Sequence, residues 1–259
     1  MHLVSACLAR RFAIVLTGMI ALVSSAGLAN RLRALDSSIL LARATGHSLA
    51  VWWPRNQACG ARFSDLFEPI PGVGVGAGYP RLVSIIASRF GLALSGRIRH
   101  TLPIEAVSRA SLVSINTIHS FISPEDFSWA KPVAGIASEI ERVGRADIGI
   151  HIRRGDHPTA TRSNPTAGFM RAMHGRPEAT FFLATDDDSV RRQVVDAFPG
   201  RVTTVGRMPS RTTIEGVQDA VVDLFCLANC SEIWASRGSS FGEVAHYLRR
   251  APLHFPAAV

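Results

Sequence analysis

Two adjacent arginines, Arg153 and Arg154, come directly after the apolar run 148–152 and are followed by Gly155 and Asp156. A guanidinium group offers several fixed N–H donors, matches a phosphate in a bidentate way and stays charged at neutral pH. Two such groups at the end of a buried strand could hold a diphosphate. The alternative is that they form surface ion pairs with Asp156 or another acid. His151, inside the strand, reads by itself as a core histidine.

Three consecutive acids, Asp186, Asp187 and Asp188, follow a second apolar segment, 180–184. Their D-x-D spacing is one that some glycosyltransferases use to bind a metal through the phosphates of a nucleotide. The alternative is that Thr185 to Asp188 form a capping box and an acidic first turn for the next helix. A carboxylate at this position could also accept hydrogen bonds from a base edge or a ribose.

A third polar segment contains Ser236, Ser239 and Ser240. Hydroxyl groups and backbone amides at the start of a helix can hold a phosphate. Ser240 with Glu243 also has the spacing of a capping box, which would be a purely structural role. In the first half of the chain, Asn30 and Arg31 lie in a comparable segment, "GLANRLR".

The second half of the chain alternates between strands and helices, and each polar segment follows a strand. This order predicts a doubly wound parallel α/β sheet. Ligands bind beyond the carboxyl ends of such strands, so the three segments should converge on one crevice. The expected strands are 148–152, 180–184, 201–205 and 232–236, and the expected helices are 188–198, 216–230 and 239–250.

The first half begins with a βαβ pattern, which predicts two parallel strands. The strands are expected at 20–24 and 48–53, and Asn30 and Gly46 are expected to cap the helix between them. Residues 59–80 read as a loop, and residues 81–135 show no clear period. We therefore expect two domains, residues 19–135 and 136–259.

The formal net charge of +8 favours anionic partners, which could be nucleic acid, a membrane surface or a phosphorylated small molecule. The arginines are scattered, without a basic stripe interleaved with aromatic residues, and this argues against nucleic acid. Peripheral contact with a membrane stays open. Cys226 and Cys230 have the i, i+4 spacing of a helix core, and we interpret the four cysteines as reduced thiols of a cytosolic protein.

The N-terminus allows two interpretations. Arg10 and Arg11 precede an apolar run that resembles a signal peptide with a small-residue cleavage site. We favour a strand at residues 19–24, because cleavage near Ala26 would remove it and leave the following turn unsupported. The expected location is cytoplasmic, with membrane association as the alternative and a cleaved leader less favoured.

Four segments, in order, resemble the fucosyltransferases that share an H-x-R-R motif: the α1,2- and α1,6-fucosyltransferases, the rhizobial nodulation fucosyltransferase and the protein O-fucosyltransferases. "HIRRGD" (151–156) resembles their first motif and "FFLATDD" (181–187) their second. Residues 219–245 are similar to their third region. "GLANRLRAL" (27–35) resembles their G-x-G-N-R-L loop, with Ala29 in place of the usual glycine. The resemblance covers roughly the first fifty residues and most of 147–248.

The resemblance implies a GT-B-like fold of two Rossmann-like domains, the first one reduced and on the acceptor side. It implies transfer of a sugar, most of all L-fucose from GDP-fucose, to a carbohydrate acceptor, with inversion and without a metal or another cofactor. Arg154, assisted by Arg153, is the expected catalytic cation. The other donor-binding residues that it implies are His151, Asp156, Asp186, Asp187, Ser236, Ser239, Ser240, Asn30 and Arg31.

Three alternatives remain open. At 259 residues the chain is short for two full nucleotide-binding-type domains, which suggests a degenerate GDP-sugar-binding module or a fragment that needs a partner. A metal-dependent transferase could use Asp186 and Asp188. A secreted or membrane-tethered protein would require a genuine leader. The sequence identifies neither the acceptor nor a general base.

Overall fold

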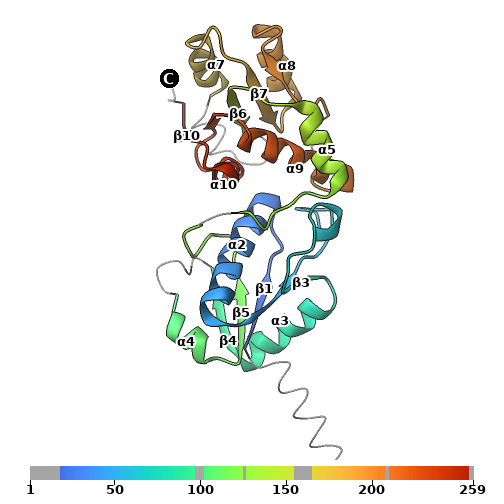
Figure 1. Ribbon diagram of the computed structural model, residues 1–259, viewed down its shortest axis with the longest axis vertical. Helices are drawn as coiled ribbons and strands as arrows, with labels where there is room; N and C mark the ends of the chain where they lie inside the picture. The colour runs from blue at the N-terminus through green and yellow to red at the C-terminus, as the bar shows by residue number, and fades with distance from the viewer. Residues whose placement is uncertain are drawn as a thin grey trace, which may run out of the picture. The chain divides into compact units, whose positions relative to one another are not determined.

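The computed structural model (Figure 1) describes residues 18–96, 98, 102–124, 127–154, 165–207 and 210–256. By their internal contacts the described residues form two compact units, one within residues 1–56 and 69–124 and the other within residues 57–68 and 125–259. The expected domains differ from these units in residues 57–68 and 125–135. Residues 57–68 pack with the second unit because Gly60 N–H donates to Arg211 O at 2.7 Å and Gln218 Nε2 donates to Asp65 O at 3.0 Å.

The first unit contains a five-stranded sheet in the order β3-β2-β1-β5-β4, and every paired strand is parallel. The predicted parallel pair, β1 and β2, is confirmed. The first domain was expected to be reduced, but its sheet has as many strands as the sheet of the second unit. The elements are β1 (Met19–Val23), α2 (Leu28–Thr45), β2 (Ser48–Trp52), β3 (Val73–Gly76), α3 (Tyr79–Phe90), β4 (Leu92–Ser95), α4 (Ile104–Arg109) and β5 (Leu112–Asn116).

Helix α2 begins earlier than the sequence predicts. Its N-cap is Gly27 rather than Asn30, because the buried stripe of the helix already starts at Leu28 and continues through Leu32 and Leu35. Most of the segment "GLANRLR", which was expected to be a loop, is therefore helical. The predicted end is confirmed, since Gly46 adopts a left-handed conformation with φ 70°.

The second unit contains a parallel sheet in the order β10-β9-β6-β7-β8. This arrangement confirms the predicted doubly wound α/β pattern. The two-residue strand β10 was not predicted. The elements are the 3₁₀ helix η1 (Phe63–Asp65), α5 (Ala134–Val143), β6 (Ile148–Ile152), α7 (Thr166–His174), β7 (Phe181–Thr185), α8 (Asp188–Ala197), β8 (Val202–Thr203), α9 (Ile214–Ala228), β9 (Glu232–Ala235), α10 (Ser240–Arg249) and β10 (Leu253–His254).

The core of the second unit lies around β6, all five residues of which are buried. Gly149 in this strand allows close approach of α9, because a Cβ atom there would lie 3.0 Å from Leu227 Cδ2 and 3.2 Å from Leu227 O. Cys226 and Cys230 are buried free thiols, as their spacing predicts. These contacts fix the strand that carries the two arginines at its end.

Strand β1 confirms the predicted strand at residues 20–24. Residues 1–17, with which the candidate leader begins, lie outside those described, and the leader interpretation stays a prediction. Among the helices of the described ranges, none combines the length and apolar character needed to cross a membrane.

Candidate functional site

The carboxyl end of β6 is the point where the strand order of the second sheet reverses. Strands β7 and β8 extend the sheet on one side of β6, and β9 and β10 extend it on the other. Open parallel α/β sheets bind ligands just outside such a point. Ser236 joins the two strand ends there: its N–H donates to His151 O at 2.9 Å, and its Oγ accepts from Arg153 N–H at 3.0 Å.

Asp186, at the end of β7, binds both arginines. One of its carboxylate oxygens forms an ion pair with Arg153 Nη1, and the other accepts from the backbone N–H of Arg154 at 2.7 Å. The side chains of Arg153 and Asp186 are 20% and 22% exposed, so this pair is partly accessible to solvent. The structure therefore brings together three of the residues predicted from the sequence.

Arg154 is more deeply held than Arg153. Its Nη1 donates to Arg153 O at 2.9 Å, and its Nη2 donates to the hydroxyl of Thr166, the first residue of α7, at 2.6 Å. Burial lowers the pKa of Arg154 from its usual value, while the carboxylates of Asp187 and Asp186 oppose that shift. The result is a fixed guanidinium in a partly desolvated place.

His151 lies beside these groups on β6 and is buried. Its ring stacks on Phe241 of α10, with 5.0 Å between the ring centroids. Burial, with the charge of Arg153 adding to it, lowers the pKa of His151 to about 3, so the imidazole is neutral at pH 7. Within the described structure Nδ1 has no hydrogen-bond partner. This nitrogen is a polar atom that a ligand could satisfy, and the predicted nucleoside contact of His151 stays a prediction.

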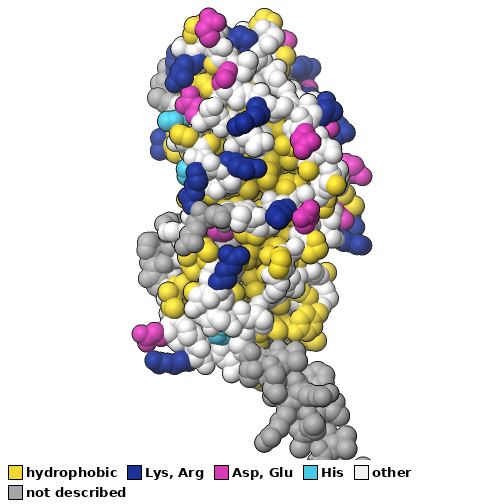
Figure 2. Space-filling model, viewed as in Figure 1, with side chains coloured by type: hydrophobic (Ala, Val, Ile, Leu, Met, Phe, Trp, Pro, Cys, Tyr) yellow, Lys and Arg dark blue, Asp and Glu magenta, His cyan; other side chains and the backbone are white. Residues whose placement is uncertain are grey.

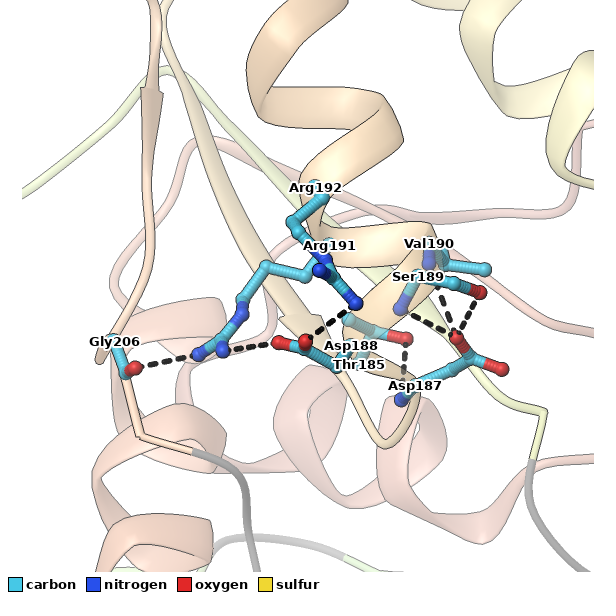
Figure 3. Close-up of polar contacts among 8 residues, drawn as sticks. All are labelled: Thr185, Asp187, Asp188, Ser189, Val190, Arg191, Arg192 and Gly206. Carbon is cyan, nitrogen blue, oxygen red and sulfur yellow. Dashed lines mark hydrogen bonds and ion pairs between the residues drawn. The ribbon is translucent and has the colours of Figure 1, made fainter.

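The other two acids of the run have structural partners (Figure 3). Asp187 is the N-cap of α8, and its carboxylate accepts from the N–H groups of Ser189 at 2.9 Å and Val190 at 3.0 Å. These bonds, with that of the Ser189 hydroxyl the largest cause, lower the pKa of Asp187. The predicted capping box of Thr185 and Asp188 is therefore wrong, because the N-cap is Asp187, whereas the predicted acidic first turn is confirmed by Asp188. The predicted donor-binding role of Asp187 is untested.

Asp186 and Asp188 do not share a partner. Asp188 forms ion pairs with Arg191 and, at 3.0 Å, with Arg192, both on its own helix (Figure 3). Asp186 instead binds the two arginines that follow β6. Within the described ranges, no group of three or more His, Cys, Asp or Glu side chains is placed to hold a metal ion.

The serine-rich segment leads into α10. Ser239 is the N-cap of this helix, and its side chain makes no capping hydrogen bond, so the predicted capping box of Ser240 and Glu243 is wrong. Its physical reason is register: Ser240 is already inside the helix. Ser239 N–H donates to Ser236 O at 3.2 Å, which ties the start of α10 to the end of β9. The predicted phosphate contacts of the three serines are untested.

Arg31 lies fully buried in the first unit. Its Nη1 donates to Pro54 O at 2.8 Å, its Nη2 donates to Asn56 Oδ1 at 3.0 Å, and its guanidinium lies over the ring of Trp53, 5.0 Å from the centroid. These contacts hold the segment after β2. Asn30 Oδ1 is buried and, among the described residues, has no hydrogen-bond partner. The donor-binding roles of both residues remain predictions, and Asp156 lies outside the described residues.

The sequence interpretation missed Thr166 and Asp223. Asp223 is buried in α9, and its Oδ1 has no hydrogen-bond partner in the described part of the chain. Burial raises its pKa well above the usual value; the charge of Asp219 adds to this shift and that of Arg191 opposes it. An acid inside the apolar run "VVDLFCLA" was the available signal, since an unpaired buried carboxyl is costly unless something else satisfies it.

No protein-family model and no curated protein sequence matches the chain. Among solved structures, the fold is similar to NodZ α1,6-fucosyltransferase soaked with GDP-fucose, with a TM-score of 0.62 and 21% identity over 90% of this chain and 92% of that one. It is also similar to a mutant of Arabidopsis thaliana FUT1 in complex with GDP, with a TM-score of 0.63 and 14% identity over 95% of this chain and 74% of that one. POFUT1 in complex with GDP-fucose is a further neighbour, with a TM-score of 0.55 and 10% identity over 92% of this chain and 97% of that one.

These neighbours belong to the groups of enzymes that the sequence motifs resemble, and they confirm the predicted α/β, GT-B-like fold.

Proposed function

We propose that the protein is a glycosyltransferase that moves L-fucose from GDP-fucose to a carbohydrate acceptor, with inversion and without a metal. The observation that carries the proposal is the pair Arg153 and Arg154, held beside the strand-order reversal by Asp186 and Thr166. The structural neighbours solved with GDP and GDP-fucose support a nucleotide sugar as the donor.

The proposed catalytic role of Arg154 follows from where charge develops. When the bond between the anomeric carbon of the sugar and the diphosphate breaks, negative charge grows on the leaving oxygen. A cation already fixed near that oxygen stabilises the transition state more than the ground state. Arg154 is fixed by Thr166 and by the backbone of Arg153, so little reorganisation would be needed.

The neighbouring groups suit recognition of the rest of the donor. His151 is neutral and has an unsatisfied nitrogen, which supports a hydrogen bond to the nucleoside. Ser239 and Ser240 lie at the N-terminus of α10, where amide groups and the helix dipole favour phosphate oxygens. Besides its proposed contact with the donor, Asp186 orients both arginines.

A non-catalytic GDP-sugar-binding module is the alternative, because a guanidinium bonded to Thr166 and to Arg153 O could hold α7 against β6 without taking part in a reaction. Such a module would bind GDP and release none from GDP-fucose. A metal-dependent transferase would lose donor binding or turnover in EDTA.

Calorimetric titration of the full chain with GDP, UDP and ADP, each with and without EDTA, tests the donor part of the proposal. We expect GDP to bind more tightly than the other two nucleotides, with the same affinity in EDTA. A folded protein that does not bind GDP, or that binds all three alike, would contradict the proposal. Loss of binding in EDTA would instead support the metal-dependent alternative.

A further inference from the structure

Helix α3 of the first unit carries large apolar side chains on its outer side. Tyr79, Leu82, Ile85 and Phe90 are 54%, 57%, 53% and 79% exposed. Figure 2 shows hydrophobic side chains gathered over the position that α3 has in Figure 1. Tyr79, Leu82 and Ile85 follow one another at a spacing of three residues, and Phe90 comes about three turns after Tyr79, so all four lie on the exposed side of the helix. We call it the α3 face.

The inner side of α3 is firmly docked, so the α3 face is part of the folded structure. Val83 and Ala87 are 1% and 0% exposed, and they pack in a cluster with Met19 and Ala21 of β1. The helix contacts all five strands of the first sheet. Its apolar outer side chains are therefore additional to those that the core of the unit requires.

Basic residues accompany the apolar strip. Arg81 and Arg89 are exposed on the same helix, and Arg81 also lies over the ring of Trp52, 5.5 Å from the centroid. The sequence contains no acid between Glu68 and Glu105, so no carboxylate of this stretch neutralises them.

The charge of the whole chain has the same distribution. The sequence of the first unit contains eleven arginines and two acids, a formal charge of +9, whereas that of the second contains seventeen basic residues and eighteen acids, a charge of −1. These values add up to the net +8 of the chain. The unit that carries the exposed apolar strip thus also carries all of the excess positive charge.

We propose that the α3 face docks on the surface of a membrane that contains anionic lipids. A helix whose exposed side carries apolar and basic side chains together can lie in the membrane interface, with its apolar side chains at the boundary of the acyl chains. Leu82, Ile85 and Phe90 would enter this boundary. Arg81 and Arg89 would contact the lipid phosphates, which a guanidinium matches well.

Charge decides between this occupant and a second copy of the chain. A second copy would bring the same arginines and the same charge of +9, which repels its partner, whereas an anionic bilayer attracts this unit. The docking proposal rests on the first unit alone and is independent of the proposed transfer reaction.

Flotation of the full chain with vesicles tests the proposal. The vesicles contain phosphatidylcholine alone or phosphatidylcholine with phosphatidylglycerol. We expect flotation with the anionic vesicles only, and weaker flotation as salt rises to about 1 M, where the Debye length falls to about 3 Å. Absence of flotation with anionic vesicles would overturn the proposal.

Variants assign the binding to the α3 face. Leu82→Glu combined with Ile85→Glu should reduce the partition coefficient between vesicles and water at least about tenfold, because two apolar groups that would enter the acyl boundary become charged. Arg81→Gln and Arg89→Gln should each reduce it about fivefold. The matched control is Ile104→Glu on α4, a position that is 52% exposed, and it should change nothing.

Two further results would contradict the docking surface. Flotation of the double Glu variant at the level of the unchanged protein would assign membrane binding to another part of the chain. A dimer by light scattering that becomes a monomer in Leu82→Glu, without flotation of either protein, would assign the α3 face to a second copy. Circular dichroism of each variant checks that it is folded.

Discussion

The carboxyl edges of the two sheets use arginine in different ways. In the first unit, Arg31 is fully buried and donates to a backbone carbonyl and to the side chain of Asn56. In the second, Arg153 is paired with the carboxylate of Asp186 and is partly exposed. Neutral backbone partners fix a loop, whereas a carboxylate holds a guanidinium in place at an accessible edge. This contrast makes Arg153, rather than Arg31, the arginine that its partners leave within reach of a ligand.

The largest expected effect is on the buried arginine. Arg31→Ala should lower the free energy of unfolding by about 3–5 kcal/mol, because it leaves buried polar partners unsatisfied and removes a large packed side chain. Arg153→Ala, at the partly exposed edge, should cost less, about 1.5–3 kcal/mol. Urea unfolding of both variants measures the difference. Equal losses would break the distinction between the two edges.

Asp186→Asn should reduce donor binding more than stability. The amide keeps the shape of the carboxylate but removes the charge that holds Arg153, a charge-assisted interaction worth about 1.5–3 kcal/mol. We therefore expect GDP to bind about tenfold to a hundredfold more weakly by calorimetry. Asp188→Asn is the matched control, since it changes an acid of the same run that binds Arg191 and Arg192. Unchanged GDP affinity in Asp186→Asn would argue that the arginines are not donor contacts.

The buried His151 predicts an acid-sensitive fold. Its pKa is about 3 in the folded protein and about 6.5 when unfolded, so between these values the unfolded chain binds the additional proton. The contribution of His151 to the free energy of unfolding is complete above pH 6.5. It is lost at up to about 1.4 kcal/mol per pH unit as the pH falls toward 3. Urea unfolding at several pH values, compared with His151→Phe, isolates this part. If the free energy of unfolding has the same pH dependence in both proteins, the pKa of His151 is not lowered by burial.

The smallest effect is expected at the helix cap. Asp187→Ala should lower the free energy of unfolding by about 1 kcal/mol, because two backbone N–H groups of α8 lose their acceptor. Asp187→Ser should retain most of the stability, since serine also caps helices. Thermal unfolding of the two variants distinguishes a cap from a donor contact: if Asp187→Ser is stable but binds GDP poorly, Asp187 has a second role.

The sequence predicted the second unit better than the first, for physical reasons that individual residues illustrate. Strand β6 was predicted with its observed bounds, since "IGIHI" is apolar throughout and ends in charged residues. Helix α3 was missed although its sequence is amphipathic, because exposed apolar residues such as Leu82 extend the apolar side beyond the buried one that carries Val83. The contact between Arg154 and Thr166 could not be predicted, because it joins residues twelve positions apart across a segment without a pattern.

Release of GDP from GDP-fucose by the full chain, with and without carbohydrate acceptors, compared between the unchanged protein and Arg154→Ala, tests the central claim most directly. The proposed role predicts turnover by the unchanged protein and a loss of about a hundredfold or more in the variant, with GDP binding weakened much less. Retained turnover in a folded Arg154→Ala would contradict the catalytic role. GDP binding without turnover by either protein, with acceptors shown to serve another fucosyltransferase, would identify a binding module instead.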